Sequence, residues 1–348
     1  MKKLHHFLCS LLAVLLLTGC TAGTAEPDPE AAESSTQYLD AMDTYMTLTA
    51  YGSNRDEALD AAVEEIRRLE ALFTVGSEDS EVSQLNRDGI ATLSEDTTAL
   101  VERALEIYDS TDGAFDITVS PLMELWGFTT QDYQVPETSE LQSALALVGA
   151  DRITYDATTS TVTLGEGQSI DLGGIAKGYT SQRLMELMEE MGVTSAMVSL
   201  GGNIQCLGTK PDGSLWRVGI QDPVGSEGAI VAVIEVEDQA VITSGSYERY
   251  FTDETTGETY HHILDPATGY PADSGLISVT IVTSDGTLGD ALSTALFIMG
   301  LEEGTAYWQA HSDEFQAVFI TTDSELYVTE GLEGSITADE GYTLLSAQ

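Results

Sequence analysis

Runs of apolar residues with two different periods alternate along the chain. Residues 45–51 (YMTLTAY) place apolar side chains at every second position, which predicts a strand. Residues 57–73 and 96–110 repeat them at helical spacing, and Ser94 precedes the second run as a candidate helix cap. Further helices are predicted over residues 80–86, 122–126, 138–148, 288–299 and 304–311, with Gly300 separating the last two.

Most of the remaining apolar runs are short and predict strands joined by turns. These strands are predicted over residues 153–155, 161–164, 196–200, 204–209, 216–220, 230–236, 240–244, 247–252, 258–264, 277–283, 317–320 and 325–328. The chain has no internal repeat and no regular alternation of strand and helix. The pattern therefore predicts the α+β class, a mostly antiparallel sheet with inserted helices, in one large domain or two closely packed lobes.

The stretch at residues 169–179 (SIDLGGIAKGY) lies between two groups of predicted strands. It is expected to end a short apolar strand, turn through two glycines and enter a helix that runs to about Met191. Glycine at such a turn permits a positive φ and leaves room for a ligand. The helix start favours an anion, and Asp171 and Lys177 flank the turn. A plain strand-to-helix corner with a surface lysine would have the same sequence, so this motif alone does not decide.

The N-terminus has the features of a bacterial export signal. Two lysines precede an apolar run over residues 7–17, which is too short to span a membrane comfortably. The next residues, Leu17-Thr18-Gly19-Cys20, resemble a lipobox, which implies cleavage before Cys20 and its acylation. We expect a lipoprotein signal peptide at 1–19 and a protein anchored through Cys20 on the extracytoplasmic face of a bacterial membrane. An ordinary signal peptide with an incidental cysteine is the alternative.

The amino-acid composition changes after Cys20. Residues 20–37 are rich in small, polar and acidic residues and show no apolar period, which predicts a flexible tether. The folded domain is expected at 38–348. It contains a single cysteine, Cys206, so no disulfide can form within it, and the apolar run around Cys206 predicts a small core residue.

The chain is strongly acidic, with 58 Asp and Glu against 13 Lys and Arg and a formal net charge of −45 at pH 7. Such a surface repels nucleic acid and anionic lipid head groups, so we expect no nucleic-acid partner. The acids are dispersed along the sequence, which is typical of an acidic globular domain and not of an acidic tail.

One predicted helix carries a candidate metal site. Asp290 and Thr294 are four residues apart and share a helix face, with Ser293 beside them. Their oxygens are hard ligands that suit Mg²⁺ or Ca²⁺. A helix-start acid with small polar neighbours on the surface is the competing interpretation. The rest of this helix is largely apolar, however, and a carboxylate in such surroundings needs a partner.

His261 and His262 end a predicted strand, so alternation places their rings on opposite faces. One ring can then face a cleft, although a single inward histidine is more often a structural hydrogen-bonding group. The hydroxyl-rich turn at residues 243–246 fits a ligand loop or ordinary turn chemistry equally well. The sequence has no zinc-spaced His/Cys cluster, no Walker loop and no serine nucleophile elbow.

Taken in order, eight blocks of sequence resemble the ApbE-type FAD:protein FMN transferases, or flavin transferases. The blocks are Met42-Asp43-Thr44; Ser80-Glu81-Val82-Ser83 with Leu85-Asn86; Gly113-Ala114-Phe115-Asp116-Ile117-Thr118 with Leu125-Trp126-Gly127-Phe128; Asp171-Leu172-Gly173-Gly174-Ile175-Ala176-Lys177-Gly178-Tyr179; Leu200-Gly201-Gly202-Asn203; Thr243-Ser244-Gly245 with Tyr247-Glu248-Arg249; His262-Ile263-Leu264-Asp265-Pro266; and Asp290-Ala291-Leu292-Ser293-Thr294. The resemblance spans nearly the whole body of the chain and implies a T-fold-like α+β domain.

The resemblance also implies a reaction and a site. The reaction is the Mg²⁺-dependent transfer of FMN from FAD to a Thr or Ser hydroxyl of an acceptor flavoprotein, with release of AMP. Acceptors would be flavoproteins of membrane redox complexes or secreted flavoproteins. The implied FAD-binding residues are Met42, Ala114, Phe115, Asp116, Asp171, Lys177 and Ile263. The implied Mg²⁺ ligands are the Gly174 carbonyl, Asp290 and Thr294, with Ser293 adjacent. His262 is implied beside the diphosphate, and either His262 or Asp290 is expected to assist proton transfer.

Two other functions fit the same residues. Water in place of the acceptor hydroxyl would make the protein a Mg²⁺-dependent FAD pyrophosphatase, and a site without turnover would make it an FAD-binding lipoprotein. One position departs from the family pattern. Many members carry an aromatic residue before the Ser80 block to cover the flavin or adenine, whereas this chain has Val75 or Gly76 there, and Phe73 is expected in the core.

Overall fold

The computed structural model describes residues 32–226, 228–339 and 341–347. The predicted signal peptide and Cys20 lie outside these residues, as does most of the predicted tether. Residues 34–37, however, were predicted to belong to the tether and instead form the start of a strand.

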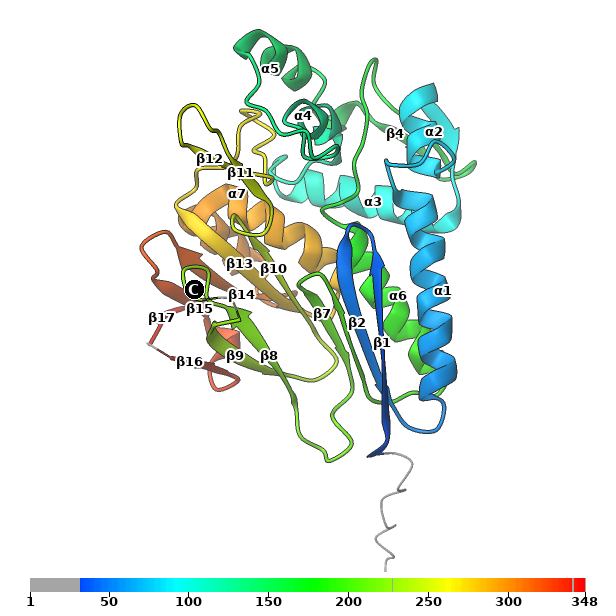
Figure 1. Ribbon diagram of the computed structural model, residues 1–348, viewed down its shortest axis with the longest axis vertical. Coiled ribbons are helices and arrows are strands. Elements are labelled where there is room, and N and C mark those ends of the chain that lie inside the picture. Colours follow the sequence, from blue (N-terminus) through cyan, green and yellow to red (C-terminus); the bar gives the residue numbers. More distant parts are fainter. Residues whose placement is uncertain (1–31, 227, 340, 348) are drawn as a thin grey trace, which may run out of the picture.

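A nine-stranded sheet runs through the molecule (Figure 1). Neighbouring strands in it are antiparallel, except for the parallel pair at its C-terminal edge. In spatial order the strands are β1 (Ser34–Ala41), β2 (Thr44–Tyr51), β6 (Ala196–Leu200), β7 (Asn203–Leu207), β10 (Ala240–Gly245), β13 (Leu276–Thr283), β14 (Gln316–Thr321), β15 (Leu326–Thr329) and β17 (Thr343–Leu345). This arrangement confirms the predicted α+β class.

Three long helices cover one face of the sheet: α1 (Arg55–Phe73), α6 (Ala176–Glu190) and α7 (Gly286–Ala310). Helices α1 and α6 pack on β2 and β6 through fully buried apolar side chains, among them Leu59, Ile66 and Leu184. Gly300 interrupts α7 with φ 80° and ψ 178°, which confirms the break predicted there.

A small sheet covers the other face. Its strands are β8 (Trp216–Gln221), β9 (Ile230–Val236) and β16 (Ile336–Ala338), and they share a core with Val241, Val282 and Val318 of the large sheet. Strand alternation turns the neighbouring Ile242 toward α7, where its Cδ1 lies 3.2 Å from the place a side chain on Gly289 would take. Cys206, 2% exposed, lies in this second core, as predicted.

The remaining α-helices and two small sheets close the end of the molecule drawn at the top of Figure 1. They are α2 (Glu81–Asp88), α3 (Glu95–Ser110), α4 (Ser120–Leu125), α5 (Thr138–Leu145), the sheet of β3 (Ile90–Thr92), β5 (Thr161–Thr163) and β4 (Thr154–Asp156), and the hairpin of β11 (Tyr250–Thr252) and β12 (Thr259–His261). The strand predicted over 247–252 begins only at Tyr250, because residues 247–249 form a turn.

The strand predicted just before the double glycine is wrong. Residues 164–175 form neither strand nor helix. The side chain of Asn86 takes the place of a neighbouring strand, since its Oδ1 accepts from the backbone N–H of Ile170 and its Nδ2 donates to the Ile170 carbonyl, each at 2.8 Å. The backbone N–H and carbonyl of Ile170 are thus both bonded by one side chain of α2.

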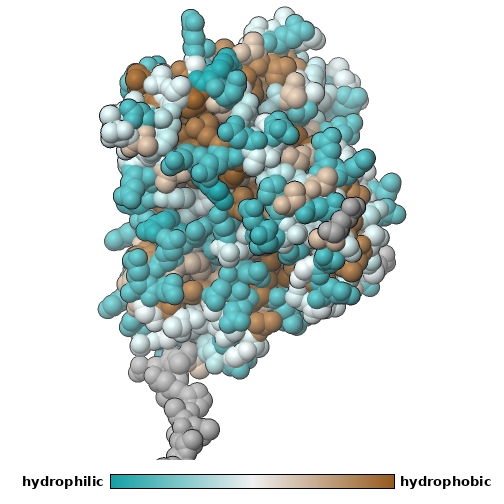
Figure 2. Space-filling view, turned by 180° about the vertical axis from the view of Figure 1, so that it is seen from behind, coloured by the Kyte–Doolittle hydropathy of each residue, from teal (hydrophilic) through white to brown (hydrophobic). Residues whose placement is uncertain are grey.

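Figure 2 shows the rear face covered mainly by hydrophilic side chains, with apolar residues exposed in separate areas. Within the described part of the chain, no helix combines the length and the apolar composition needed to cross a membrane.

Candidate active site

The double-glycine corner is held by its own charged neighbours. Oδ1 of Asp171 accepts from the Gly173 N–H at 2.7 Å, and Nζ of Lys177 donates to the Gly173 carbonyl at 3.1 Å. Neither Gly173 nor Gly174 has a positive φ, so that part of the prediction is wrong. Glycine serves here for space, because a Cβ on Gly174 would lie 3.3 Å from Cε2 of Phe115. The corner leads directly into the first turn of α6.

Asp290 of α7 meets this corner from the other side. It is 4% exposed, and its Oδ2 accepts from the Gly178 N–H at 2.8 Å. The two helices touch at this point, since a Cβ on Gly178 would lie 2.2 Å from the Gly286 carbonyl oxygen and 2.5 Å from Cβ of Asp290. The structure therefore brings the two predicted stretches together, and Asp290 is not the surface acid of the competing interpretation.

Hydroxyl groups extend the site along α7. Ser293 is fully buried, and its hydroxyl donates to the Asp290 carbonyl at 2.8 Å. Oγ1 of Thr294 lies 4.0 Å from the place that a Cβ on Gly174 would take. Ser244, at the end of β10, lies 2.7 Å from Oγ of Ser293 and 3.3 Å from Oγ1 of Thr294. Ser244 belongs to the hydroxyl-rich turn whose role the sequence left open, and the structure places it beside the candidate metal ligands.

These oxygens suit a hard divalent cation. Asp290 has one carboxylate oxygen that Gly178 does not engage, and the Thr294 hydroxyl lies beside Gly174, whose carbonyl is the third predicted ligand. No group of three or more His, Cys, Asp or Glu side chains in the described residues could hold a metal ion. A site with one carboxylate matches the usual mode of Mg²⁺ binding, in which substrate phosphates and water complete the coordination.

His262 lies at the base of the β11–β12 hairpin. The carbonyl of Arg249 accepts from the His262 backbone N–H at 3.0 Å and lies 3.2 Å from Nδ1 of its ring. A carbonyl can only accept, so this contact places the ring proton on Nδ1 and leaves Nε2 free to take a proton. Burial, together with the nearby Arg249 and Lys177 charges, lowers the pKa of His262 to about 3, which keeps the ring neutral. His261 has other neighbours, the Ala272 carbonyl and the Phe297 ring.

Two cations lie near both Asp171 and His262. Burial raises the pKa of the Asp171 carboxyl, and the Gly173 N–H, the Arg249 guanidinium and the Lys177 ammonium oppose that rise. Because both cations act on Asp171 and on His262, they converge on one region of a protein that is otherwise strongly acidic. An anion approaching the start of α6 would be attracted there.

Met42 reaches the site through a strained turn. Met42 and Asp43 form the two-residue link between β1 and β2, with φ of 48° and 57°. The Met42 N–H donates to Oε1 of Glu70 at 2.5 Å, and its Sδ lies 3.7 Å from the Thr180 hydroxyl of α6. A non-glycine residue held at positive φ stores backbone strain, which is characteristic of functional positions.

Three other predicted FAD-binding residues are buried. Phe115 and Ile263 are each 4% exposed and belong to the main core, whereas Ala114 beside them is partly exposed. Asp116 is buried, and its oxygens accept from Thr118 and from the Ala150 N–H at 2.6–3.2 Å. Asp116 therefore shapes the loop beneath the corner, and burial raises the pKa of its carboxyl.

The segment before the Ser80 block agrees with the sequence analysis. Phe73 is 5% exposed and packs edge-on against Tyr179 of α6, with ring centroids 5.8 Å apart. Val75 packs against the same core. Neither residue supplies an exposed ring for stacking.

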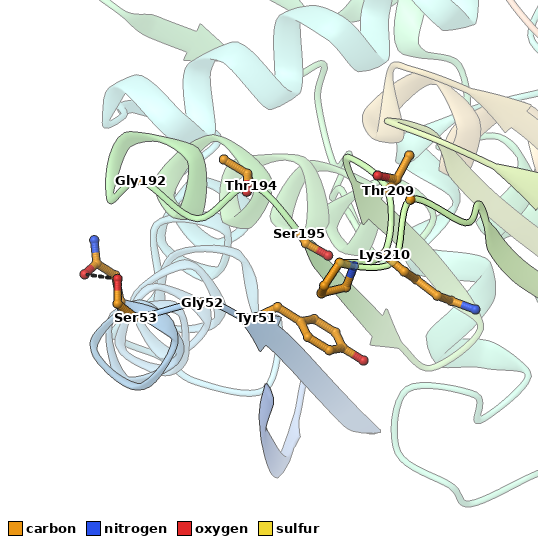
Figure 3. Close-up of a pocket in the computed structure, with 11 residues that line it drawn as sticks. Tyr51, Gly52, Ser53, Gly192, Thr194, Ser195, Thr209 and Lys210 are labelled. Carbon is orange, nitrogen blue, oxygen red and sulfur yellow. Dashed lines mark hydrogen bonds between the residues drawn. The ribbon is translucent and has the colours of Figure 1, made fainter. Parts of the chain in front are cut away.

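A separate pocket of about 410 Å³ lies away from this site (Figure 3). Tyr51 lines it at the far end of β2, and Gly192 lines it just beyond the last turn of α6. The candidate site lies at the first turn of α6, and the helix rises about 1.5 Å per residue over its 15 residues. The two places are thus separated by the length of α6.

Comparison with known proteins places this geometry in a family. The ApbE family model matches residues 42–319. A Klebsiella pneumoniae protein named FAD:protein FMN transferase is 34% identical over 281 residues, covering 79% of this chain and 86% of that protein. A Treponema pallidum protein of the same name is 32% identical over 342 residues, covering 92% and 93%.

Solved structures give the same result. The ApbE protein from Thermotoga maritima superposes with a TM-score of 0.81 at 33% identity, covering 87% of this chain and 99% of that one. The flavin transferase ApbE from Vibrio cholerae superposes with a TM-score of 0.77 at 27% identity, with the same coverage. With fold, site geometry and sequence in agreement, the chain belongs to the ApbE family.

Proposed function

We propose that this protein transfers FMN from FAD to a Thr or Ser hydroxyl of an acceptor flavoprotein and releases AMP. One observation carries the proposal: the hydrogen bond from Gly178 to Asp290 joins an anion-binding helix start to a hard-oxygen cluster. A diphosphate needs both, because its negative charge must be held by N–H groups and cations and neutralised where the bond breaks.

Binding of the diphosphate would use the start of α6. In its first turn, the N–H groups of Ala176 and Gly178 already donate to the Leu172 carbonyl and to Asp290. The positive end of the helix, the Lys177 ammonium and the Arg249 guanidinium would therefore hold the diphosphate. The strained Met42 would pack over the rest of FAD from the β1–β2 turn. The partly exposed Ala114 and the buried Phe115 would form the wall beside Gly174.

The donor set fits Mg²⁺, which the Gly174 carbonyl, Asp290 and Thr294 would hold, with Ser293 fixing the local geometry of α7. When bound, Mg²⁺ would neutralise charge on the diphosphate oxygens and so favour cleavage between the two phosphorus atoms.

His262 is the residue we assign to proton transfer. The acceptor hydroxyl oxygen forms a bond to the phosphorus of the FMN half, the bond from that phosphorus to the bridging oxygen breaks, and AMP leaves with the electron pair. Nε2 of His262 takes the hydroxyl proton, since Nδ1 faces the Arg249 carbonyl. Asp290 is a poor base, because the Gly178 N–H and a cation would both compete for its oxygens.

The neutral ring is a weak base in the free protein, where its pKa is lowered to about 3. A bound diphosphate places negative charge near the ring, which raises the pKa of the imidazole toward the range where a base is effective. Proton transfer is thereby coupled to the presence of FAD.

Mass spectrometry tests the proposal. The protein is incubated with FAD, Mg²⁺ and candidate acceptor domains from membrane redox complexes and secreted flavoproteins. We expect the mass of FMN on one Thr or Ser and one AMP released for each adduct. AMP release at the same rate without any acceptor would support the pyrophosphatase, and FAD retention without AMP would support a binding protein.

We also propose that the mature chain is lipid-anchored through Cys20 and acts on the extracytoplasmic face of a bacterial membrane. The lipobox-like sequence supports this proposal. The mature N-terminus of membrane-bound protein should be a diacylated Cys20, and Cys20→Ser should release the protein from the membrane fraction. A wild-type N-terminus without lipid would contradict it.

A further inference from the structure

Six aromatic residues form a continuous group of rings beside the candidate base. The group, here called the aromatic cluster, consists of Trp126, Phe128, Tyr133, Phe251, Tyr260 and Tyr270. It joins the segment after α4 to the β11–β12 hairpin, at the top of Figure 1. Tyr133 stacks on Phe251 with centroids 5.3 Å apart, and Phe251 stacks on Tyr260 at 5.5 Å.

The inner rings of the cluster are fixed and the outer ones face solvent. Trp126 and Phe128 are fully buried, and Nε1 of Trp126 donates to the Gly269 carbonyl at 2.9 Å. Tyr133 and Tyr270 are 40% and 42% exposed. The result is a rigid base that presents two tyrosines at its rim, an arrangement typical of contact sites that lose little conformational entropy on binding.

The cluster is continuous with the candidate active site. The Phe128 ring packs edge-on against His262 with centroids 6.4 Å apart, and the Phe128 carbonyl accepts from the Arg249 guanidinium at 2.6 Å. Phe251 and Tyr260 are opposite each other in the hairpin, and Arg249 and His262 are the next opposed pair on the same face. Tyr133 and His262 contact the same Phe128 ring, so a polypeptide that lies across the exposed tyrosines would bind next to His262.

We propose that the aromatic cluster is the docking surface for the acceptor protein. This inference rests on the proposed function, which requires a macromolecule to deliver a hydroxyl group to His262. The occupant is an extended segment with an apolar side chain next to its target Thr or Ser. Carboxylates lie at the rim, Asp132 beside Tyr133 and Glu258 bonded to the Tyr260 hydroxyl, so neutral or basic flanking residues fit this surface and acidic ones are repelled.

The test compares tyrosine variants with an acceptor domain that the wild-type protein flavinylates. Tyr133→Ala and Tyr270→Ala should each raise KM for the acceptor about tenfold. They should leave kcat at saturating acceptor and KM for FAD unchanged, because neither ring contacts the residues assigned to FAD. Tyr133→Phe, which keeps the ring, should have a KM for the acceptor close to that of the wild type. Tyr38→Ala is the matched control, since Tyr38 is 63% exposed on β1 and should alter nothing.

The outcomes separate the two proposals. If wild-type protein flavinylates no acceptor, the proposed function fails and this inference fails with it. If wild-type protein is active and both alanine variants keep the wild-type KM for the acceptor, only the docking surface is wrong. If the alanine variants raise KM for FAD and leave KM for the acceptor unchanged, the docking proposal is also wrong, because the rings then bind the flavin. Should Tyr133→Ala fail to fold, Tyr270→Ala provides the same test at the other end of the cluster.

Discussion

Gly178 and Asp290 are 112 residues apart in the chain and are joined by a 2.8 Å hydrogen bond from backbone N–H to carboxylate. The glycine is needed for this contact, because any Cβ would collide with the Gly286 carbonyl. The bond satisfies one oxygen of a nearly fully buried carboxylate and leaves the other for a ligand. It therefore sets both the packing of α6 on α7 and the chemistry at the crossing point.

Gly178→Ala should destabilise the protein. The added Cβ would lie 2.2 Å from a backbone oxygen and 2.5 Å from Cβ of Asp290, so the helices must move apart. We expect a loss of about 1–3 kcal/mol in the free energy of unfolding, measured by urea denaturation. Glu189→Ala, on the exposed side of the same helix, should change it by less than about 0.5 kcal/mol. Equal stabilities for the two variants would contradict the close crossing.

Asp290→Asn should separate folding from cation binding. The amide oxygen can still accept from the Gly178 N–H, so the fold should survive, but the negative charge is lost. We expect the Mg²⁺ concentration for half-maximal transfer to rise by about 10–100-fold. Ser246→Ala is the control, because among the described residues the Ser246 hydroxyl hydrogen-bonds to the Ile277 carbonyl alone. An unchanged Mg²⁺ dependence in Asp290→Asn would remove this residue from the cation site.

Because the pKa of His262 is lowered in the folded protein, the free energy of unfolding should decrease in acid. Its pKa is about 3 in the folded protein and about 6.5 when unfolded, so between these values the unfolded chain binds more protons. Stability then increases with pH across that window and is lost as pH falls from 6.5. The drop in urea midpoint between pH 7 and pH 4.5 should be smaller in His262→Gln than in wild type. An equal drop would mean that the imidazole is not held neutral.

Asp43→Gly should stabilise the β1–β2 hairpin. Both link residues have positive φ, the conformation of a type I′ turn, and glycine is preferred at the second position. We expect a gain of about 0.5–1 kcal/mol in the free energy of unfolding, whereas Asp43→Ala should lower it. If alanine is tolerated as well as glycine in thermal and urea unfolding, the turn is not strained.

The helices and most strands could be predicted because their apolar periods agree with their packing. Leu59 and Ile66 of α1 are buried at helical spacing, and the residues of β8 alternate between buried and exposed positions. The β1–β2 hairpin was missed for two reasons. Its edge strand carries mostly polar residues, and Met42-Asp43 lacks the glycine that signals a two-residue turn.

The members of the candidate site could be named from sequence blocks, but their contacts could not. The sequence does not show whether Gly178 faces solvent or another helix. Only the packing of α6 on α7 shows that it lies at a helix crossing. For a similar reason the role of Ser244 stayed open, and the Arg249 carbonyl was missed. A hydroxyl-rich turn has no distinctive spacing, and a backbone oxygen has no sequence signal.

A crystal structure of the FAD complex with Mn²⁺ in place of Mg²⁺ would locate the cation by the anomalous signal of the metal. We predict one cation peak bounded by the Gly174 carbonyl, Asp290 and Thr294, with the FAD diphosphate beside it at the start of α6. A cation held elsewhere, or FAD bound in the pocket of Figure 3 at the opposite end of α6, would contradict the account.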